Sequence, residues 1–249
     1  MRDFRKKQLK FGVIAILAVA AIASANLWKR GLGVKTVVVV GNRIVQTNEV
    51  VQLAQIQPGT MLYDVDLTAV RRNVESHHYV KSAVVERDLP SAIRITVNER
   101  KPVALVNRPD FVYLDEDGVI LPRSISKALF DLPVISGISD NVPLKLGTTV
   151  GQDDVREALT ILRMLKLVNL DLSHQISEVQ VRNGGDIVLV TAEGAVPVIF
   201  GRGEITDKLL RLEAFWNQVV RVRGTEDLRY IDLRFADQVV VRWNQRRAS

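Results

Sequence analysis

Val80–Val97 reads VKSAVVERDLPSAIRITV, and this stretch decides the fold of the first half of the chain. Ile93, Ile95 and Val97 alternate with polar residues, which is the period of a strand with one buried face. Asp88-Leu89-Pro90-Ser91 supplies a turn between this strand and a preceding one at Val80–Arg87. The stretch therefore predicts two consecutive strands joined by a short turn.

The residues before this stretch predict one more strand and two helices. Val34–Val40 is an apolar, β-branched run, and Gly41-Asn42 provides a turn after it. Thr47 is a suitable cap for a helix over Asn48–Ala54. Asp64 or Asp66 can cap a second helix, in which Leu67, Val70 and Val74 recur at three- and four-residue spacing. Residues 34–101 therefore predict the order β-α-α-β-β.

From residue 102 to residue 249 the sequence predicts a second, larger α+β domain. Amphipathic helices are expected at Val155–Val168 and at about Ile205–Val222. Short β-prone runs surround them, and Asn183-Gly184-Gly185-Asp186 predicts a hairpin turn. The chain closes with predicted strands at Leu228–Phe235 and Val239–Trp243. We expect a mainly antiparallel β domain with two helices.

Residues 11–28 predict an N-terminal transmembrane helix. The run Phe11–Leu27 contains no charge and no proline, and Trp28 follows it as an interfacial aromatic. Basic residues in the tail, residues 1–10, place that tail in the cytoplasm by the positive-inside rule. A cleaved signal peptide ending at Ala23-Ser24-Ala25 and a buried soluble helix are the alternatives. The first two interpretations both export the bulk of the chain.

Composition excludes several classes of function. The chain has 249 residues and no cysteine, which removes disulfides, thiol nucleophiles and thiolate metal sites. The net charge is +6, but the basic residues are spread along the chain and usually stand next to acids. A nucleic-acid-binding protein would concentrate them on one face with aromatics, so we expect no nucleic-acid partner.

Three segments, in this order, resemble the FtsQ/DivIB family of bacterial cell-division proteins. The first is Val37–Asn42, followed by Val45, Thr47 and Glu49, which resembles the opening of the family's POTRA domain. The second runs from Val80 through Leu89-Pro90 to Glu99-Arg100 and Pro102-Val103-Ala104. The third is Tyr230–Phe235, YIDLRF, with Val241 and Trp243 after it. One departure is Ser76-His77-His78-Tyr79, where family members often carry Pro-Trp.

The resemblance implies a non-enzymatic scaffold of the division machinery. Such proteins cross the inner membrane once, with the N-terminus in the cytoplasm and the bulk of the chain in the periplasm at the division site. Here residues 34–101 would be the POTRA domain and residues 102–249 the C-terminal β domain. The family's partners are single-pass division proteins, chiefly FtsB and FtsL, and its members help to recruit septal peptidoglycan synthases. Other division components would bind the POTRA domain, for which residues 34–40 and the second helix are candidate surfaces.

The C-terminal strand is the candidate partner-binding site. A last strand in an open sheet is an edge with unpaired backbone groups, and Val239-Val240-Val241 is strongly β-prone. The alternative is an interior strand whose apolar residues belong to the core. The resemblance places the FtsB-contacting residues in this segment. Together the two arguments nominate Tyr230, Arg234, Phe235, Asp237, Gln238, Val240 and Trp243, and they predict that Trp243→Ala or a charge at position 240 abolishes partner capture in a folded monomer.

Enzymatic interpretations find little support in the sequence. His77-His78 would diverge and no third metal ligand stands near them, so a solvated turn is expected there. Asp115-Glu116-Asp117-Gly118 lacks the later ligands of a calcium loop, and a turn is expected there too. We therefore predict no catalytic residues, no metal and no cofactor.

The competing function is a POTRA-containing accessory protein of envelope protein transport or outer-membrane assembly. Such proteins usually carry tandem POTRA units or a membrane barrel. This sequence predicts one such unit followed by a compact α+β domain, which favours the division scaffold.

Overall fold

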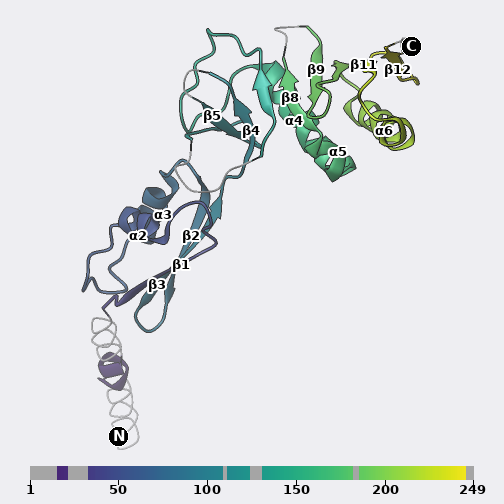
Figure 1. Ribbon diagram of the computed structural model, residues 1–249. Helices are drawn as coiled ribbons and strands as arrows, with labels where there is room; N and C mark the ends of the chain where they lie inside the picture. Colours follow the sequence, from purple (N-terminus) through teal and green to yellow (C-terminus); the bar gives the residue numbers. More distant parts are fainter. Residues whose placement is uncertain (1–15, 22–32, 109–110, 124–130, 182–184, 245–249) are drawn as a thin grey trace, which may run out of the picture. The chain divides into compact units, whose positions relative to one another are not determined.

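The computed structural model describes residues 16–21, 33–108, 111–123, 131–181 and 185–244 (Figure 1). Its internal contacts divide the chain into two compact units, Met1–Glu99 and Arg100–Ser249. The predicted transmembrane helix 11–28 and tail 1–10 lie outside the described residues, except for residues 16–21, which are helical. Within the described chain no helix has both the length and the apolar character needed to span a bilayer.

The first unit has the predicted β-α-α-β-β order. Its elements are β1 (Thr36–Val40), α2 (Thr47–Ala54), α3 (Leu67–Glu75), β2 (Val80–Asp88) and β3 (Ala92–Glu99). The sheet order is β1-β3-β2, with β1 parallel and β2 antiparallel to the central β3. Ile93 and Ile95 of β3 are fully buried and Val97 is 3% exposed, so the alternation in the sequence correctly predicted the core face.

Local side-chain chemistry fixes the loops of this unit. Asp66 caps α3, since its carboxylate accepts hydrogen bonds from the backbone N–H groups of Thr68 and Ala69, each at 3.0 Å. The cap of α2 is Gln46 and not Thr47, so the predicted boundary was wrong by one residue. Gly41 has a φ of +87°, and a Cβ there would lie 2.2 Å from the Val97 carbonyl oxygen. Only glycine allows β1 to turn this closely past β3.

The second unit contains a nine-stranded sheet in the order β12-β11-β10-β9-β8-β7-β4-β5-β6. The strands are β4 (Pro102–Val106), β5 (Val112–Asp115), β6 (Ile120–Leu121), β7 (Val134–Ser136), β8 (Ile176–Gln180), β9 (Ile187–Thr191), β10 (Pro197–Gly201), β11 (Leu228–Asp232) and β12 (Val240–Trp243). The helices are α4 (Asp153–Val168), α5 (Leu170–His174), α6 (Ile205–Phe215), the π-helical η1 (Trp216–Val220) and α7 (Arg221–Arg223).

Most pairings in this sheet are antiparallel, as the sequence predicted, but the sheet also contains parallel pairings that it did not predict. Five of the strand pairs among the described residues are antiparallel, while β4–β7, β7–β8 and β10–β11 are parallel. The predicted hairpin pairs β8 with β9, and its turn residues 182–184 lie outside the described residues. The predicted helix Ile205–Val222 is interrupted by the π-helical turn η1.

The core of the second unit lies on one face of the sheet. A row of directly paired side chains crosses four strands, from Val179 to Leu189, Val198 and Ile231, and each is fully buried. Helices α4 and α6 supply the opposing wall, with Leu162 and Leu165 from α4 and Leu209 and Leu212 from α6. Burial of this apolar face holds the sheet and its helices together.

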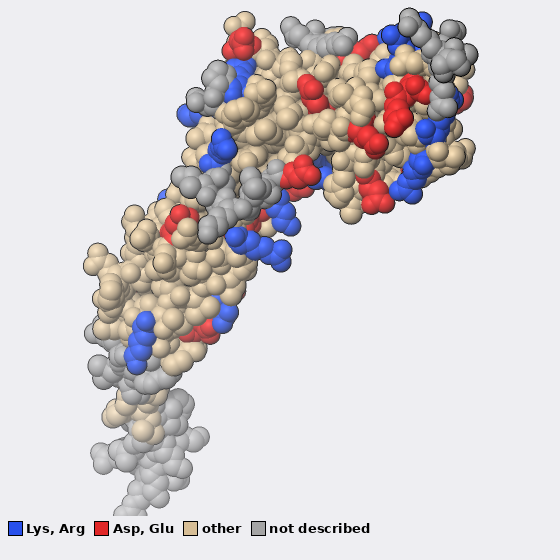
Figure 2. All heavy atoms as spheres, viewed as in Figure 1, with Lys and Arg blue, Asp and Glu red and all other residues tan. Residues whose placement is uncertain are grey.

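The acidic run Asp115–Gly118 forms the expected turn. The buried carboxylate of Asp115 accepts hydrogen bonds from the backbone N–H groups of Asp117 at 3.0 Å and Val119 at 2.8 Å. Arg100 pairs with the same carboxylate at 2.7 Å. Asp115 therefore organises the β5–β6 turn and ties it to the start of the unit. On the face of this unit shown in Figure 2, acidic and basic side chains are interspersed.

Candidate partner-binding strand

Strand β12 is at the end of the nine-stranded sheet, with β11 on one side (Figure 1). The backbone N–H of Leu233 donates to the carbonyl oxygen of Ile199 at 2.9 Å. In this part of β11 the backbone N–H and C=O groups of the odd-numbered residues therefore point toward β10. The backbone groups of Tyr230 and Asp232 consequently point toward β12, where these two residues pair with Arg242 and Val240. The backbone groups of Val241 and Trp243 point the other way, and within the described chain no strand pairs with them.

The side chains of β12 divide between the two faces of the sheet. Val241 pairs with the buried Ile231 and extends the core row to the end of the sheet, while Trp243 also packs against the core. Val240 and Arg242 alternate with them and lie on the opposite face. Of the three predicted edge valines, Val240 is therefore the one that is not part of the core packing.

Arg234 is bound by two carboxylates of its own domain. Its guanidinium donates to Asp232 at 2.7 to 3.3 Å and to Asp186 at 2.9 Å. These hydrogen bonds lower the pKa of the buried Asp232 and raise the pKa of Arg234. The Arg234 side chain stays 45% exposed. A partner can therefore reach its outer edge, but its charge already has internal partners.

The turn between β11 and β12 is held on helix α6. Arg211 of α6 donates to the carbonyl oxygens of Phe235 at 2.5 Å and Gln238 at 3.0 Å. Asp237, between them, has a φ of +56°. The side chains of Phe235, Asp237 and Gln238 are exposed. The turn thus presents three predicted site residues on a backbone that α6 positions.

Trp243 is fixed from two directions. One side packs on the core, and the guanidinium of Arg223 lies 3.8 Å from the ring centroid. This is the geometry of a cation–π contact. The next residue, Asn244, donates its backbone N–H to the carbonyl oxygen of Asp227 at 2.7 Å. Trp243 therefore has a structural role at the end of β12 in addition to its candidate role in binding.

Tyr230 borders a shallow cavity of about 290 Å³ on the face of the sheet opposite the core. Val188, Ile199 and Arg234 also line it, so this cavity lies beside the Arg234–Asp232 pair. All seven predicted residues thus lie on β11, on β12 or on the turn between them. Sequence reasoning missed Asp232, Asp186 and Arg211, which hold Arg234 and the turn. The i, i+2 spacing of Asp232 and Arg234 along an extended chain was the available signal for the first of these.

The first unit offers two further edges. Both β1 and β2 are end strands of its sheet, and Val84 of β2 is 55% exposed. The predicted candidate surface 34–40 includes β1, which has β3 on one side. The second predicted surface, the helix α3, faces the sheet through its buried Val70 and Val74. Neither surface carries a feature that selects a partner.

Comparison with known proteins identifies both units. Residues 32–100 match the family described as "POTRA domain, FtsQ-type", and residues 104–234 match "Cell division protein FtsQ/DivIB, C-terminal". The second match ends at Arg234, so the predicted site residues from Phe235 onward lie beyond it.

Curated relatives are similar in sequence to this chain along most of its length. It is 32% identical over 246 residues to the cell division protein FtsQ of Rhodothermus marinus, covering 96% of this chain and 88% of that protein. The cell division protein FtsQ of Syntrophotalea carbinolica is 31% identical over 228 residues, 91% of this chain and 80% of the relative. That of Geobacter sp. strain M21 is 30% identical over 198 residues, 80% of this chain and 71% of the relative. The chain therefore belongs to the FtsQ/DivIB family of cell division proteins.

Proposed function

We propose that this chain is a non-enzymatic scaffold that captures FtsB/FtsL-like single-pass division proteins in the periplasm and links them to septal peptidoglycan synthesis. The observation that carries the proposal is the open edge of β12. Its outward N–H and C=O groups, on Val241 and Trp243, form a template on which a partner strand can extend the sheet.

Side chains around this edge would select the partner. Main-chain hydrogen bonds supply affinity in strand addition, while neighbouring side chains supply specificity. Val240, Tyr230 and Phe235 offer apolar surface, and Arg234 keeps an exposed edge of its guanidinium. Aromatic residues and arginine are the types that most often dominate interface energetics. The turn residues Asp237 and Gln238 are exposed beside this surface.

Membrane anchoring fits the same function. The apolar run Phe11–Leu27 would hold the chain in the inner membrane with residues 1–10 in the cytoplasm. Partners that cross the same membrane would then meet it at a raised effective concentration. The POTRA domain, next to the membrane, would bind further division components and enrich the chain at the division site.

A proline at residue 241 tests the proposal. Val241→Pro removes an N–H that points to the open edge and leaves the pairing of β12 with β11, because the neighbouring residues make that pairing. The matched control is Val241→Ala, which loses similar core contact but keeps the N–H. Each full-length variant is co-expressed with the organism's own FtsB-like protein and purified from detergent, and each is used to rescue cells depleted of the wild-type protein.

We expect the alanine variant to retain the partner and to restore septa. The proline variant should lose the partner and leave filamentous cells. Equal capture by both variants would contradict strand addition at β12, and normal septation in depleted cells would refute the division role itself.

A further inference from the structure

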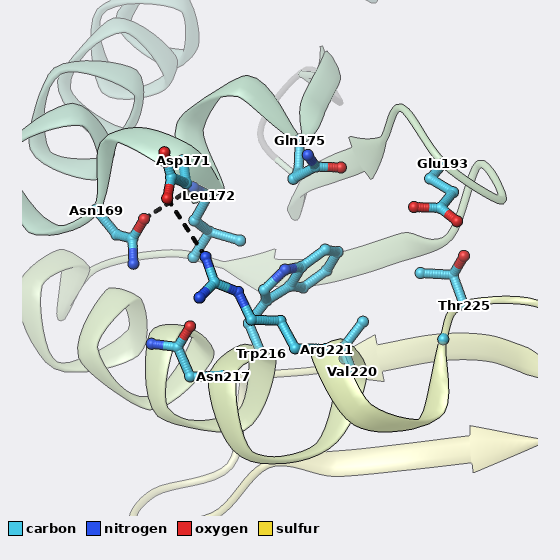
Figure 3. Close-up of a pocket in the computed structure, with 11 residues that line it drawn as sticks. Asn169, Asp171, Leu172, Gln175, Glu193, Trp216, Asn217, Val220, Arg221 and Thr225 are labelled. Atoms are coloured by element: carbon cyan, nitrogen blue, oxygen red, sulfur yellow. Dashed lines mark hydrogen bonds and ion pairs between the residues drawn. The ribbon is translucent and has the colours of Figure 1, made fainter.

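The pocket beside the π-helical turn η1, of about 280 Å³, is lined in part by polar side chains that pair within the second unit (Figure 3). Asn169 accepts from the backbone N–H of Leu172 at 2.9 Å, and Arg221 turns to Asp171, which it meets at 3.4 Å. Polar groups that already pair with one another do not select a ligand. The feature that points outward is a group of exposed apolar side chains in the first unit.

The loop of residues 60–65 crosses one end of the three-stranded sheet of the first unit. Near its start, Met61 forms an antiparallel bridge with Gly33. Near its end, the Arg87 side chain of β2 donates at 2.9 to 3.2 Å to three carbonyl oxygens of the loop, those of Leu62, Tyr63 and Val65. The Arg87 guanidinium also lies 5.7 Å from the centroid of the Tyr63 ring. The loop is therefore held both where the chain reaches β1 and where β2 ends (Figure 1).

The turn between β2 and β3 completes this end of the unit. The carbonyl oxygen of Ser91 accepts a hydrogen bond from the backbone N–H of Lys35 at 2.8 Å. The start of the unit is thus bonded to the loop and to the turn. We call residues 33–36, the loop 60–65 and the turn 89–91 together the base of the first unit.

Three exposed side chains with large apolar surface lie at the base. Leu89 is 59% exposed, and Met61 and Tyr63 are each 38% exposed. In the rest of residues 33–99 the exposed large apolar side chains are Val51 on α2 and Val84 in β2. Exposed apolar surface is therefore concentrated at the end of the unit where the chain enters the sheet. Clustered exposed apolar side chains are typical of a contact surface.

The base is the part of this unit that the chain holds nearest to the predicted membrane helix. The apolar run ends at Leu27, and Trp28 stands five residues before Gly33. Five residues span at most about 18 Å, so the base stays within that distance of the bilayer interface. Tyrosine is enriched at this interface, where apolar side chains beside it can insert. The exposed Lys35 and Asp64 have opposite charges, so apolar insertion and not charge would drive the contact.

We propose that the base of the first unit rests on the surface of the membrane that anchors the chain, with Met61, Tyr63 and Leu89 inserted among the lipid headgroups. The bilayer covers the apolar surface that the unit leaves exposed, while the Tyr63 hydroxyl stays in the polar layer. This contact restricts the rotation of the first unit about the five-residue connection. It rests on the membrane anchoring in the proposed function and is independent of strand addition at β12.

Fluorescent labels at single cysteines test the contact, since the chain has no cysteine of its own. Leu89→Cys and Val84→Cys are each labelled with a nitrobenzoxadiazole group, and the full-length chain is placed in phosphatidylcholine nanodiscs with or without a nitroxide headgroup lipid. Val84 is the matched control, because it is 55% exposed and lies five residues, about 17 Å, from Leu89 along the chain. We expect the nitroxide to quench about half of the fluorescence at residue 89 and little of it at residue 84.

The contribution of the native side chains is measured with the label at residue 89. Met61→Ser should lower the quenching by about half, because it removes an inserted apolar side chain. Val51→Ser should not change it, since Val51 has a similar exposure of 37% but lies on α2. Val241→Pro, which acts on β12, should also leave the quenching unchanged.

Equal quenching at residues 84 and 89, or quenching at residue 89 that Met61→Ser leaves unchanged, would overturn the proposal. A signal at residue 89 that changes only when a division protein is added would assign the base to a protein partner instead. The same samples distinguish this contact from the anchoring. A chain that does not co-elute with the nanodiscs would refute both, whereas co-elution without preferential quenching would refute the contact alone.

Discussion

Arg234 turns back on Asp232, two residues earlier in the chain, and donates three side-chain hydrogen bonds of 2.7 to 3.3 Å to its carboxylate. Asp232 is 4% exposed, whereas the arginine side chain is 45% exposed. The pair thus joins a buried anion at the end of β11 to the surface from which the β11–β12 turn begins. Charge-assisted, forked contacts of this kind fix geometry as well as contributing energy.

Asp232→Asn should destabilise the chain. The substitution removes the charge that pairs with Arg234 while keeping the shape of the side chain. We expect the free energy of unfolding to fall by about 1–2 kcal/mol, which is at the low end for charge-assisted hydrogen bonds because the arginine is half-exposed. Chemical unfolding followed by tryptophan fluorescence measures it. Asp153→Asn is the control, because Asp153 is 87% exposed where it pairs with Arg156. Equal effects of the two substitutions would show that the pair adds nothing.

The same pair predicts a dependence of stability on pH. The hydrogen bonds from Arg234 lower the pKa of Asp232 in the folded protein below its ordinary 3.8. A lowered folded-state pKa means that the stabilisation is fully present above the unfolded-state pKa and is lost as the pH falls through the folded-state pKa. Wild-type protein should therefore lose more unfolding free energy than Asp232→Asn between pH 6 and about pH 2. If the unfolding free energies of the two proteins fell by the same amount over this pH range, the prediction would be wrong.

Substitution of Val240 should affect partner binding without affecting folding. Its side chain lies on the face opposite the core and is only partly buried, so Val240→Glu should leave the melting temperature within about 2 °C of wild type. A carboxylate at the open edge should nevertheless weaken capture of the FtsB-like partner at least tenfold, since charges on edge strands oppose pairing. Val240→Thr, which keeps the β-branched shape, is the control. Pull-down from detergent with calibrated partner concentrations measures the ratio, and undiminished capture by the glutamate variant would reject Val240 as a contact.

The sequence was most informative where one face of an element is buried and the other is not. The alternation of β3 and the helical spacing of Val70 and Val74 predicted the first unit element by element. Pairing in the second unit was less accessible, because local periodicity says which face is buried and not which strand lies next to it. Strand β7, with three residues, is too short to show alternation, yet it joins β4 to β8 through two parallel pairings.

The candidate partner-binding strand was likewise predictable from the sequence only in part. Its position at the chain's end and the types of its residues were readable from the sequence. The contacts that hold it come from residues distant in sequence, since Arg211 reaches the turn from α6 and Asp186 reaches Arg234 from the start of β9. The pocket at η1 was not predicted, because an insertion of one residue into a helical turn leaves no periodic signal over so short a segment.

Arg211 should control the order of the β11–β12 turn. Arg211→Met keeps the length of the side chain but removes the donors to the Phe235 and Gln238 carbonyl oxygens. We expect faster amide hydrogen exchange at Val239–Trp243, a loss of about 1 kcal/mol in unfolding free energy and weaker partner capture. Arg163→Met, at an exposed position of α4, should change none of these. Unchanged exchange in the Arg211 variant would mean that the turn does not depend on α6.

Trp243 packs against the core and is also a candidate contact for the partner. Substitutions that remove different parts of its side-chain contacts are therefore needed to separate the two roles. Trp243→Ala removes core contact and the stack with Arg223, and we expect it to cost about 2 kcal/mol of stability in addition to partner binding. Trp243→Phe retains an aromatic face and should restore most of the stability. Arg223→Ala isolates the cation–π contribution, expected at about 0.5–1 kcal/mol. Thermal unfolding of the three variants, set beside their partner capture, separates the two roles. A fully stable Trp243→Ala variant without partner binding would assign Trp243 to recognition alone.

Glu99, the last residue of β3, should be a principal stabiliser of the first unit. Its carboxylate accepts from the backbone N–H of Ile44 at 2.9 and 3.1 Å and from that of Val45 at 2.8 Å, so both oxygens are used. Glu99→Gln replaces one acceptor oxygen by a donor that faces these N–H groups, and we expect a loss of about 1–3 kcal/mol in unfolding free energy. The amides of Ile44 and Val45 should also exchange faster with deuterium. Glu49→Gln is the matched control, because the exposed Glu49 accepts one backbone hydrogen bond, at 3.3 Å from Gln46, and its loss should cost less than about 1 kcal/mol. If both variants unfold alike, the loop after β1 is held by the packing of Val45 and not by Glu99.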